Sequence, residues 1–145
     1  MPDSSDRATY LGLLASAPAG RLADLLPDLP PHDLLRPPEI GTVMVRGRSG
    51  GTGAPFNLGE MTVTRASVRL PGGMVGHGYV QGRSRDHALR AAVVDALMQT
   101  DAADRIRTGV LTPLAAERQA RNTTRAARAA ATRVEFFTLV RGEDT

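Results

Sequence analysis

A glycine-rich segment in the middle of the chain is the first part of the sequence that could do chemistry. Arg48 is followed closely by three glycines, at Gly50, Gly51 and Gly53. Backbone amides in such a segment can converge on an anion, and the arginine adds positive charge, so the segment is a candidate phosphate site. It lacks the Gly-Lys-Ser/Thr ending of a P-loop and the glycine spacing of a dinucleotide-binding loop. A simple turn between two strands is the alternative interpretation.

A second candidate phosphate site lies where a helix is predicted to begin. Arg83 and His87 stand on either side of Ser84, a residue type that commonly caps helices. The free amides and the dipole at a helix N-terminus favour negative charge, so a phosphate or a carboxylate could bind there. The alternative is a well-capped helix in which Arg83 pairs with an acid and His87 is half buried.

Four arginines on one side of a predicted C-terminal helix form a candidate partner interface, which we call the arginine stripe. They are Arg118, Arg121, Arg125 and Arg128. At 100° per residue they fall within an arc of about 80°, opposite a row of alanines that allows close packing. Glu117 can pair with Arg121, and the remaining like charges repel one another. A solvated helix face is the alternative, whereas an acidic partner or nucleic acid would relieve the repulsion.

Several kinds of catalysis are excluded by residue types that the chain lacks. It has no cysteine, which excludes disulfides, thiolate catalysis and cysteine-ligated metals. All 18 basic residues are arginine, so no lysine can form a Schiff base or serve a P-loop. The three histidines are not at metal-ligand spacing, and no elbow motif supports a catalytic serine. We therefore expect no catalytic residue, no metal and no cofactor in this chain.

The N-terminal half is predicted to position these residues on short helices and a sheet. Leucine spacing predicts helices over 6–18 and 20–26, and five prolines predict an extended connector over 27–39. Alternating β-branched residues predict strands over 41–48, 61–70 and 74–81, the last two joined by the turn Pro71-Gly72-Gly73. In the middle strand the apolar side changes, which predicts a bulge near Arg65 or burial of both faces.

The C-terminal half is predicted to be mainly helical. A helix over 84–100 has a core-facing stripe, a polar connector follows over 101–112, and an alanine-rich helix covers 114–132 behind Pro113. Residues 133–141 carry Phe and Val on both sides and predict a buried strand, with a helix end docking into the core as the alternative. The fold class is α+β: an antiparallel sheet of three to four strands, with short N-terminal helices and two longer helices of the C-terminal half packed on it.

Length and composition indicate a soluble chain with one main domain. Its 145 residues are 41% hydrophobic and 23% charged, and no apolar run could span a membrane. Residues 1–39 are predicted to be a helical, proline-rich lead-in packed on the domain or on a partner, and residues 40–145 a single α+β domain. The acidic N-terminus argues against a secretory signal and predicts a cytoplasmic location. The basic excess lies in residues 40–145, which suits phosphorylated ligands, nucleic acid or an acidic partner.

Several sequence strings, taken in order, resemble the PhnG family, a subunit of the bacterial carbon–phosphorus lyase core complex. They include Arg48-Ser-Gly-Gly-Thr-Gly53, Gly59-Glu60-Met-Thr-Val-Thr-Arg65-Ala66, Gly78-Tyr79-Val80-Gln81-Gly82-Arg83, Asp95-Ala-Leu-Met-Gln99 and Val134-Glu-Phe-Phe-Thr-Leu-Val-Arg-Gly142. The resemblance spans roughly residues 40–145, and the first 39 residues match only as a variable helical lead-in.

The resemblance implies an accessory role in phosphonate metabolism. Members of the family assemble with PhnH-, PhnI- and PhnJ-like subunits and with an ATPase-like subunit. The assembly transfers a phosphonate such as methylphosphonate onto ATP with loss of adenine, giving ribose 1-phosphonate 5-triphosphate, so that ATP is a co-substrate. The resemblance carries no catalytic residue over to this chain. The alternatives from the residues alone are a basic nucleic-acid-binding module and a stand-alone nucleotide-binding enzyme that uses the glycine-rich segment.

Overall fold

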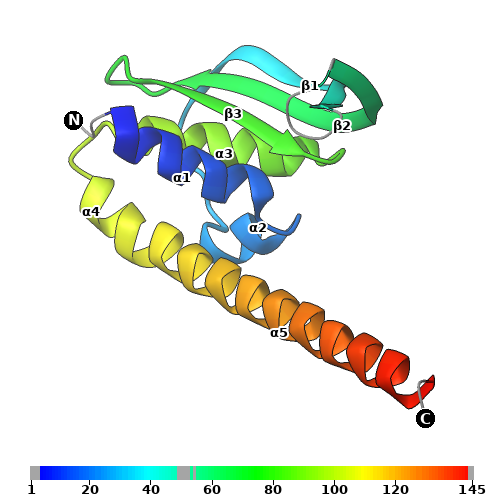
Figure 1. Cartoon of the computed structure of the whole chain (residues 1–145). Helices are drawn as coiled ribbons and strands as arrows, with labels where there is room; N and C mark the ends of the chain where they lie inside the picture. The colour runs from blue at the N-terminus through cyan, green and yellow to red at the C-terminus, as the bar shows by residue number, and fades with distance from the viewer. Residues whose placement is uncertain (1–3, 49–52, 54, 144–145) are drawn as a thin grey trace.

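A three-stranded antiparallel sheet lies over a layer of helices, and one long helix extends away from both (Figure 1). The computed structural model describes residues 4–48, 53 and 55–143. The elements in chain order are α1 Ser4–Ser16, α2 Arg21–Leu25, β1 Asp33–Arg48, β2 Pro55–Arg69, β3 Val75–Gln81, α3 Arg85–Leu97, α4 Ala103–Ile106, a π-helical turn Arg107–Leu111 and α5 Thr112–Glu143. The predicted α+β class is confirmed, and the described residues form three strands.

Strand β1 begins within the segment that was predicted to be a connector. It starts at Asp33 rather than at residue 41, and it pairs with β2 from Asp33↔Arg69 to Arg48↔Pro55. Two prolines are tolerated because β1 is an edge strand, where missing amide donors cost little. The pairing shifts register on either side of Arg36. The predicted division between residues 39 and 40 therefore falls inside this strand.

The predicted hairpin of the second and third strands is confirmed. β2 and β3 pair antiparallel from Val63↔Gln81 to Arg69↔Val75 without interruption, and the turn is closed by the Gly73 amide, which donates to the Leu70 carbonyl at 2.8 Å. A bulge was one of two explanations for the change of apolar side near Arg65. The register shift next to the Glu39↔Arg65 pair places the extra residue on β1, not on β2. Val63 and Thr64 are both buried, so burial on both faces accounts for the change of apolar side in β2.

Helix α3 lies directly against the sheet because glycine and alanine face each other there. A Cβ atom added at Gly76 would lie 1.9 Å from the Ala92 carbonyl oxygen, and one added at Gly78 would lie 2.1 Å from the Ala88 carbonyl oxygen. Real Cβ atoms do not come so close to backbone. The helix backbone therefore contacts strand β3 at a distance that only glycine allows.

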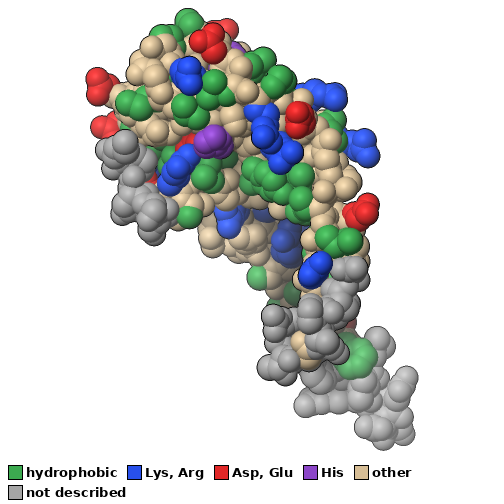
Figure 2. All heavy atoms as spheres, turned by 90° about the horizontal axis from the view of Figure 1, so that it is seen from above, with side chains coloured by type: hydrophobic (Ala, Val, Ile, Leu, Met, Phe, Trp, Pro, Cys, Tyr) green, Lys and Arg blue, Asp and Glu red, His purple; other side chains and the backbone are tan. Residues whose placement is uncertain are grey.

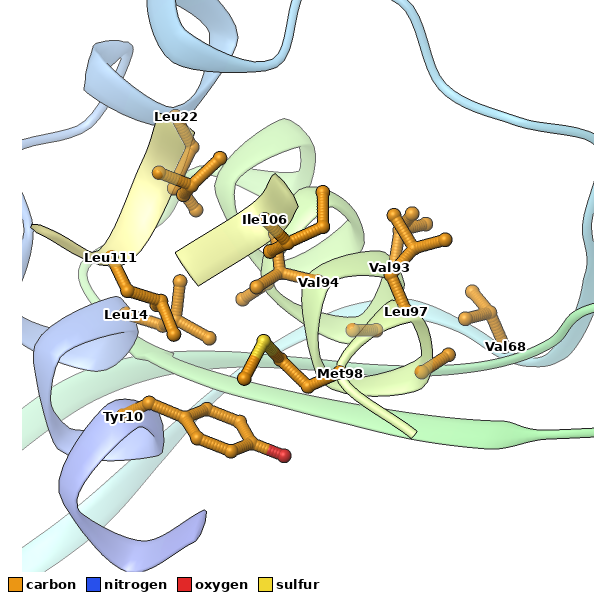
Figure 3. Packing of buried hydrophobic residues seen from close by; sticks show 14 of the residues in the cluster. Tyr10, Leu14, Leu22, Val68, Val93, Val94, Leu97, Met98, Ile106 and Leu111 are labelled. Carbon is orange, nitrogen blue, oxygen red and sulfur yellow. The ribbon is translucent and has the colours of Figure 1, made fainter. Parts of the chain in front are cut away.

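The core sits between the sheet and the helices and is built around α3 (Figure 3). α3 is buried on nearly all sides, as expected for a helix with apolar residues all round. Helix α1 contributes Tyr10 and Leu14, and α2 contributes Leu22, so the lead-in forms part of this core. Ile106 and Leu111 belong to the same core, so the segment that follows α3 also contributes to it (Figure 3).

Two predictions about the C-terminal half are wrong. Residues 103–111 are helical rather than a connector, because Ile106, Val110 and Leu111 form a buried stripe. A wider π-helical turn precedes Pro113, whose ring would otherwise crowd the carbonyl four residues earlier. Residues 133–141 continue α5 instead of forming a strand, and Val134 and Phe136 remain 64% and 62% exposed. Among the described side chains of α5, those from residue 118 to residue 136 are exposed, whereas Leu114 in the first turn is buried in the core.

Candidate functional site

The glycine-rich segment joins β1 to β2 at the tip of a hairpin. Arg48 ends β1 and faces Pro55 of β2 in the register, and Gly53 lies in a bend between the strands. Gly50 and Gly51 lie outside the described residues. The segment thus has the position of a strand-to-strand turn, and its proposed role in phosphate binding stays a prediction.

The structure directs Arg83 and His87 to different surroundings. Arg83 is exposed in the connection between β3 and α3, whereas the His87 side chain is 1% exposed. Its Nε2 atom lies 2.7 Å from the Leu14 carbonyl oxygen of α1, and its backbone amide donates to the Ser84 hydroxyl at 3.1 Å. Ser84 therefore caps α3 as predicted, and the His87 ring joins α3 to α1 instead of facing a ligand beside Arg83.

Burial lowers the pKa of the His87 imidazole below its usual value, against smaller opposing effects of the Leu14 carbonyl and Asp86. When pH falls through about 6.5, the unfolded chain binds a proton on this histidine and the folded chain resists it. The contribution of the neutral His87 to the free energy of unfolding is therefore fully present above that pH. It decreases as the pH falls further, until the pH passes the lowered pKa of the folded state.

We expect His87→Gln to reduce this loss of stability, because glutamine keeps a donor for Leu14 and does not titrate. Urea unfolding at about pH 7.5 and about pH 5.5 measures the difference in free energy of unfolding. The control is His32→Gln, which removes a histidine outside the core and leaves His87 in place. A pH dependence unchanged in His87→Gln would contradict the prediction.

A buried carboxylate joins three elements beside β3. Asp95 of α3 is fully buried and accepts hydrogen bonds from Arg7 at 2.8 and 3.1 Å, from the Tyr10 hydroxyl at 2.7 Å and from the His77 amide at 2.9 Å. Burial and the hydrogen bond to Asp95 raise the pKa of Tyr10 above its usual range. Since every carboxylate oxygen is used within the chain, this cluster has a structural role.

The arginine stripe lies on an exposed part of α5. Arg121, Arg125 and Arg128 line a shallow groove along the helix together with Ala120 and Thr124. Arg118 lies nearer the domain, where one of its guanidinium nitrogens is 3.9 Å from the position of a Cβ added at Gly12 in α1.

Glu117 does not reduce the charge of the arginine stripe as the sequence suggested. It accepts a hydrogen bond from Arg21 at 2.6 Å, which fixes the first turns of α5 to α2. Among the described residues, no ion pair links the stripe to an acid of this chain. The stripe is therefore a free cationic surface on a projecting helix.

A third surface, the open face of the sheet, was not predicted from the sequence. The helices cover only one side of the sheet, and Figure 2 shows basic and hydrophobic side chains lying together on the other. Two rows of paired residues cross the three strands on this face: Arg36, Ser67 and His77 in one, and Glu39, Arg65 and Tyr79 in the next. Alternation along each strand places such residues on one face, but only the register brings them into rows.

Within the described part of the chain, no group of three His, Asp or Glu side chains is arranged to hold a metal ion. The same residues include no helix with the length and hydropathy needed to cross a bilayer.

The described residues form an α+β domain with a projecting helix and an open sheet face. Residues 5–142 match the family model described as "Phosphonate metabolism protein PhnG". The chain is 46% identical over 143 residues to the alpha-D-ribose 1-methylphosphonate 5-triphosphate synthase subunit PhnG of Rhizobium meliloti (strain 1021), covering 97% of this chain and 92% of that protein. The chain belongs to the PhnG family, and the resemblance found in its sequence is confirmed.

Proposed function

We propose that this chain is an accessory subunit of an alpha-D-ribose 1-methylphosphonate 5-triphosphate synthase. The observation that carries the proposal is its 46% identity, across 97% of its length, to a subunit of that synthase. In the reaction that we propose, a phosphonate such as methylphosphonate displaces adenine from ATP, and the products are adenine and ribose 1-phosphonate 5-triphosphate. The catalytic groups belong to a neighbouring subunit, and PhnH-, PhnI- and PhnJ-like subunits with an ATPase-like subunit are the partners.

The projecting part of α5 supports an assembly role. From residue 118 to residue 136 every described side chain is exposed, including Val134 and Phe136. An isolated helix in water gains little stability from propensity alone, and most helical stability in proteins comes from packing. The apolar residues that suggested a buried strand lie on this projecting helix. We infer that a partner subunit covers them in the complex.

Truncation after Arg121 tests this role of α5. The core extends along the chain from Tyr10 to Leu114, and the Arg21–Glu117 ion pair is kept, so the free energy of unfolding should change by less than about 1 kcal/mol. We expect the truncated chain to lose co-purification with PhnI-, PhnH- and PhnJ-like subunits after co-expression. Mass determination of the eluted complex, together with urea unfolding of the chain, measures both effects.

A matched pair of point variants separates α5 from other exposed apolar positions. Val134 and Leu58 are 64% and 62% exposed, on α5 and on β2 respectively. Val134→Asp should reduce the recovered complex, and Leu58→Asp should leave it close to the wild-type amount. Full recovery with both Val134→Asp and the truncation would show that α5 does not bind a partner.

A nucleic-acid-binding role is the alternative, and the arginine stripe is the feature that favours it. Such binding would weaken steeply with salt, because cations are released from the nucleic acid. Salt-dependent binding of DNA or RNA by a chain that forms no complex with the other subunits would support the alternative.

A further inference from the structure

The open face of the sheet gathers cationic and hydrogen-bonding groups around one shallow concavity. Arg36, Arg65, Ser67, His77 and Tyr79 line it, and Arg65 and Tyr79 also line a second concavity beside Val63. The register places these residues in two adjacent rows across three strands. Directly paired residues on one face have Cβ atoms about 5 Å apart, so their side chains can contact one ligand together.

Within the described part of the chain, most donors of this face are not used. Arg36 has no hydrogen bond or ion pair among the described residues, and Arg65 reaches Glu39 only at 3.7 Å, beyond hydrogen-bond distance. Ser67 Oγ lies 2.9 Å from His77 Nδ1, and a hydroxyl that donates to Nδ1 leaves the ring proton on Nε2, where it can be given to a ligand. Guanidinium groups are suited to phosphate, with which they form paired hydrogen bonds.

The backbone behind this face is held in place from within the core. The His77 amide donates to buried Asp95 at 2.9 Å, and the Gln99 side chain donates to the Val75 carbonyl at 2.8 Å. Both contacts occupy backbone groups on the free edge of β3. His77 is thereby carried on a fixed strand rather than on a loop, which favours an ordered binding surface.

We propose that this face binds the triphosphate group of a phosphate ester, with Arg36, Arg65 and His77 as its donors. Adjacent rows lie about 6.6 Å apart along a strand. Cations in the two rows can therefore contact successive phosphates of one triphosphate group, whereas a single phosphate could not bridge the two rows. The choice of a triphosphate rests on the proposed function. Glu39 lies in the same row as Arg65, and Asp33 lies in a flanking row. Both carboxylates reduce the positive charge, and Glu39 opposes binding most directly.

Calorimetric titration of the full chain with inorganic tripolyphosphate tests the proposal. We expect saturable binding that is at least about tenfold tighter than binding of inorganic phosphate at equal ionic strength, equivalent to about 1.4 kcal/mol. Arg36→Gln combined with Arg65→Gln should weaken tripolyphosphate binding at least about tenfold. The matched control is Arg105→Gln combined with Arg133→Gln, two exposed arginines outside this face and outside the arginine stripe, which removes the same charge elsewhere and should stay within about twofold of wild type.

A further variant should strengthen tripolyphosphate binding instead of weakening it. Glu39→Gln removes the nearest carboxylate and should strengthen tripolyphosphate binding a few-fold. Absence of saturable binding, or equal weakening in the two double variants, would overturn the proposal. Because assembly is measured separately by co-purification, a chain that binds tripolyphosphate but joins no complex would contradict the proposed function alone. A complex that forms while its PhnG chain does not bind tripolyphosphate would overturn this inference alone.

Discussion

Gly76→Ala is expected to lower the free energy of unfolding by about 3 kcal/mol or more. The added Cβ would lie 1.9 Å from the Ala92 carbonyl oxygen and 2.5 Å from the Ala96 amide nitrogen. Both are backbone atoms of α3, so relief requires the whole helix to move away from the sheet. Since α3 is the centre of the core, that movement would loosen its contacts with α1 and α2 as well. A loss of this size is a large part of the stability of a typical domain.

Gly41→Ala is the matched control, because it adds the same methyl group to a strand. No atom lies within 4 Å of the position of its Cβ. We expect its urea unfolding midpoint to stay close to wild type, while that of Gly76→Ala falls steeply. Ala96→Gly should not rescue Gly76→Ala, because the closest contacts are with backbone. A Gly76→Ala protein within about 1 kcal/mol of wild type would show that α3 can shift at little cost.

Asp95→Ala is the second substitution with a large expected effect, again about 3 kcal/mol or more. It leaves the Tyr10 hydroxyl and the His77 amide without their acceptor, and each unsatisfied buried donor costs about 1–3 kcal/mol. Arg7 loses less, since its side chain is 39% exposed and can bind water. Urea unfolding measures the loss. Asp101→Ala, at an exposed position, is the control and should lie within about 0.5 kcal/mol of wild type.

Asp95→Ala also tests whether Asp95 fixes the free edge of β3 at the His77 amide. If Asp95 fixes the free edge of β3, its loss should increase hydrogen exchange at the His77 amide more than at amides in the β1–β2 ladder. An Asp95→Ala protein with unchanged stability and unchanged exchange at His77 would show that water replaces the carboxylate without cost.

Local signals in the sequence were sufficient to predict structure where the structure of a segment depends on residues within that segment. The turn Pro71-Gly72-Gly73 predicted the β2–β3 hairpin, and Ser84 predicted the start of α3. Both depend on contacts between residues close in the chain. The end of α5 was mispredicted because Phe and Val on both sides of a segment indicate burial without indicating what covers it. In the described part of the chain Val134 remains 64% exposed, and a partner subunit is our proposed explanation.

The candidate site was only partly accessible from the sequence. The arginine stripe followed from helical spacing and lies on an exposed helix as predicted. His87 was assigned to a phosphate site because it follows a helix cap, but its ring is turned to Leu14, a residue 73 positions away. The rows that bring Arg36 and His77 together were missed, because they depend on two register shifts around Arg36 in β1.

By itself the sequence determined the α+β class, the order of most helices and strands, and membership of the PhnG family, because these depend on local periodicity, turn chemistry and ordered motifs. Only the tertiary structure decided that Gly76 and Gly78 let α3 touch the sheet, that Asp95 is shared by α1 and β3, and that an uncovered sheet face gathers arginines. The physical reason is that such contacts join residues far apart in the chain, whose distance is set by how the layers pack and by strand register.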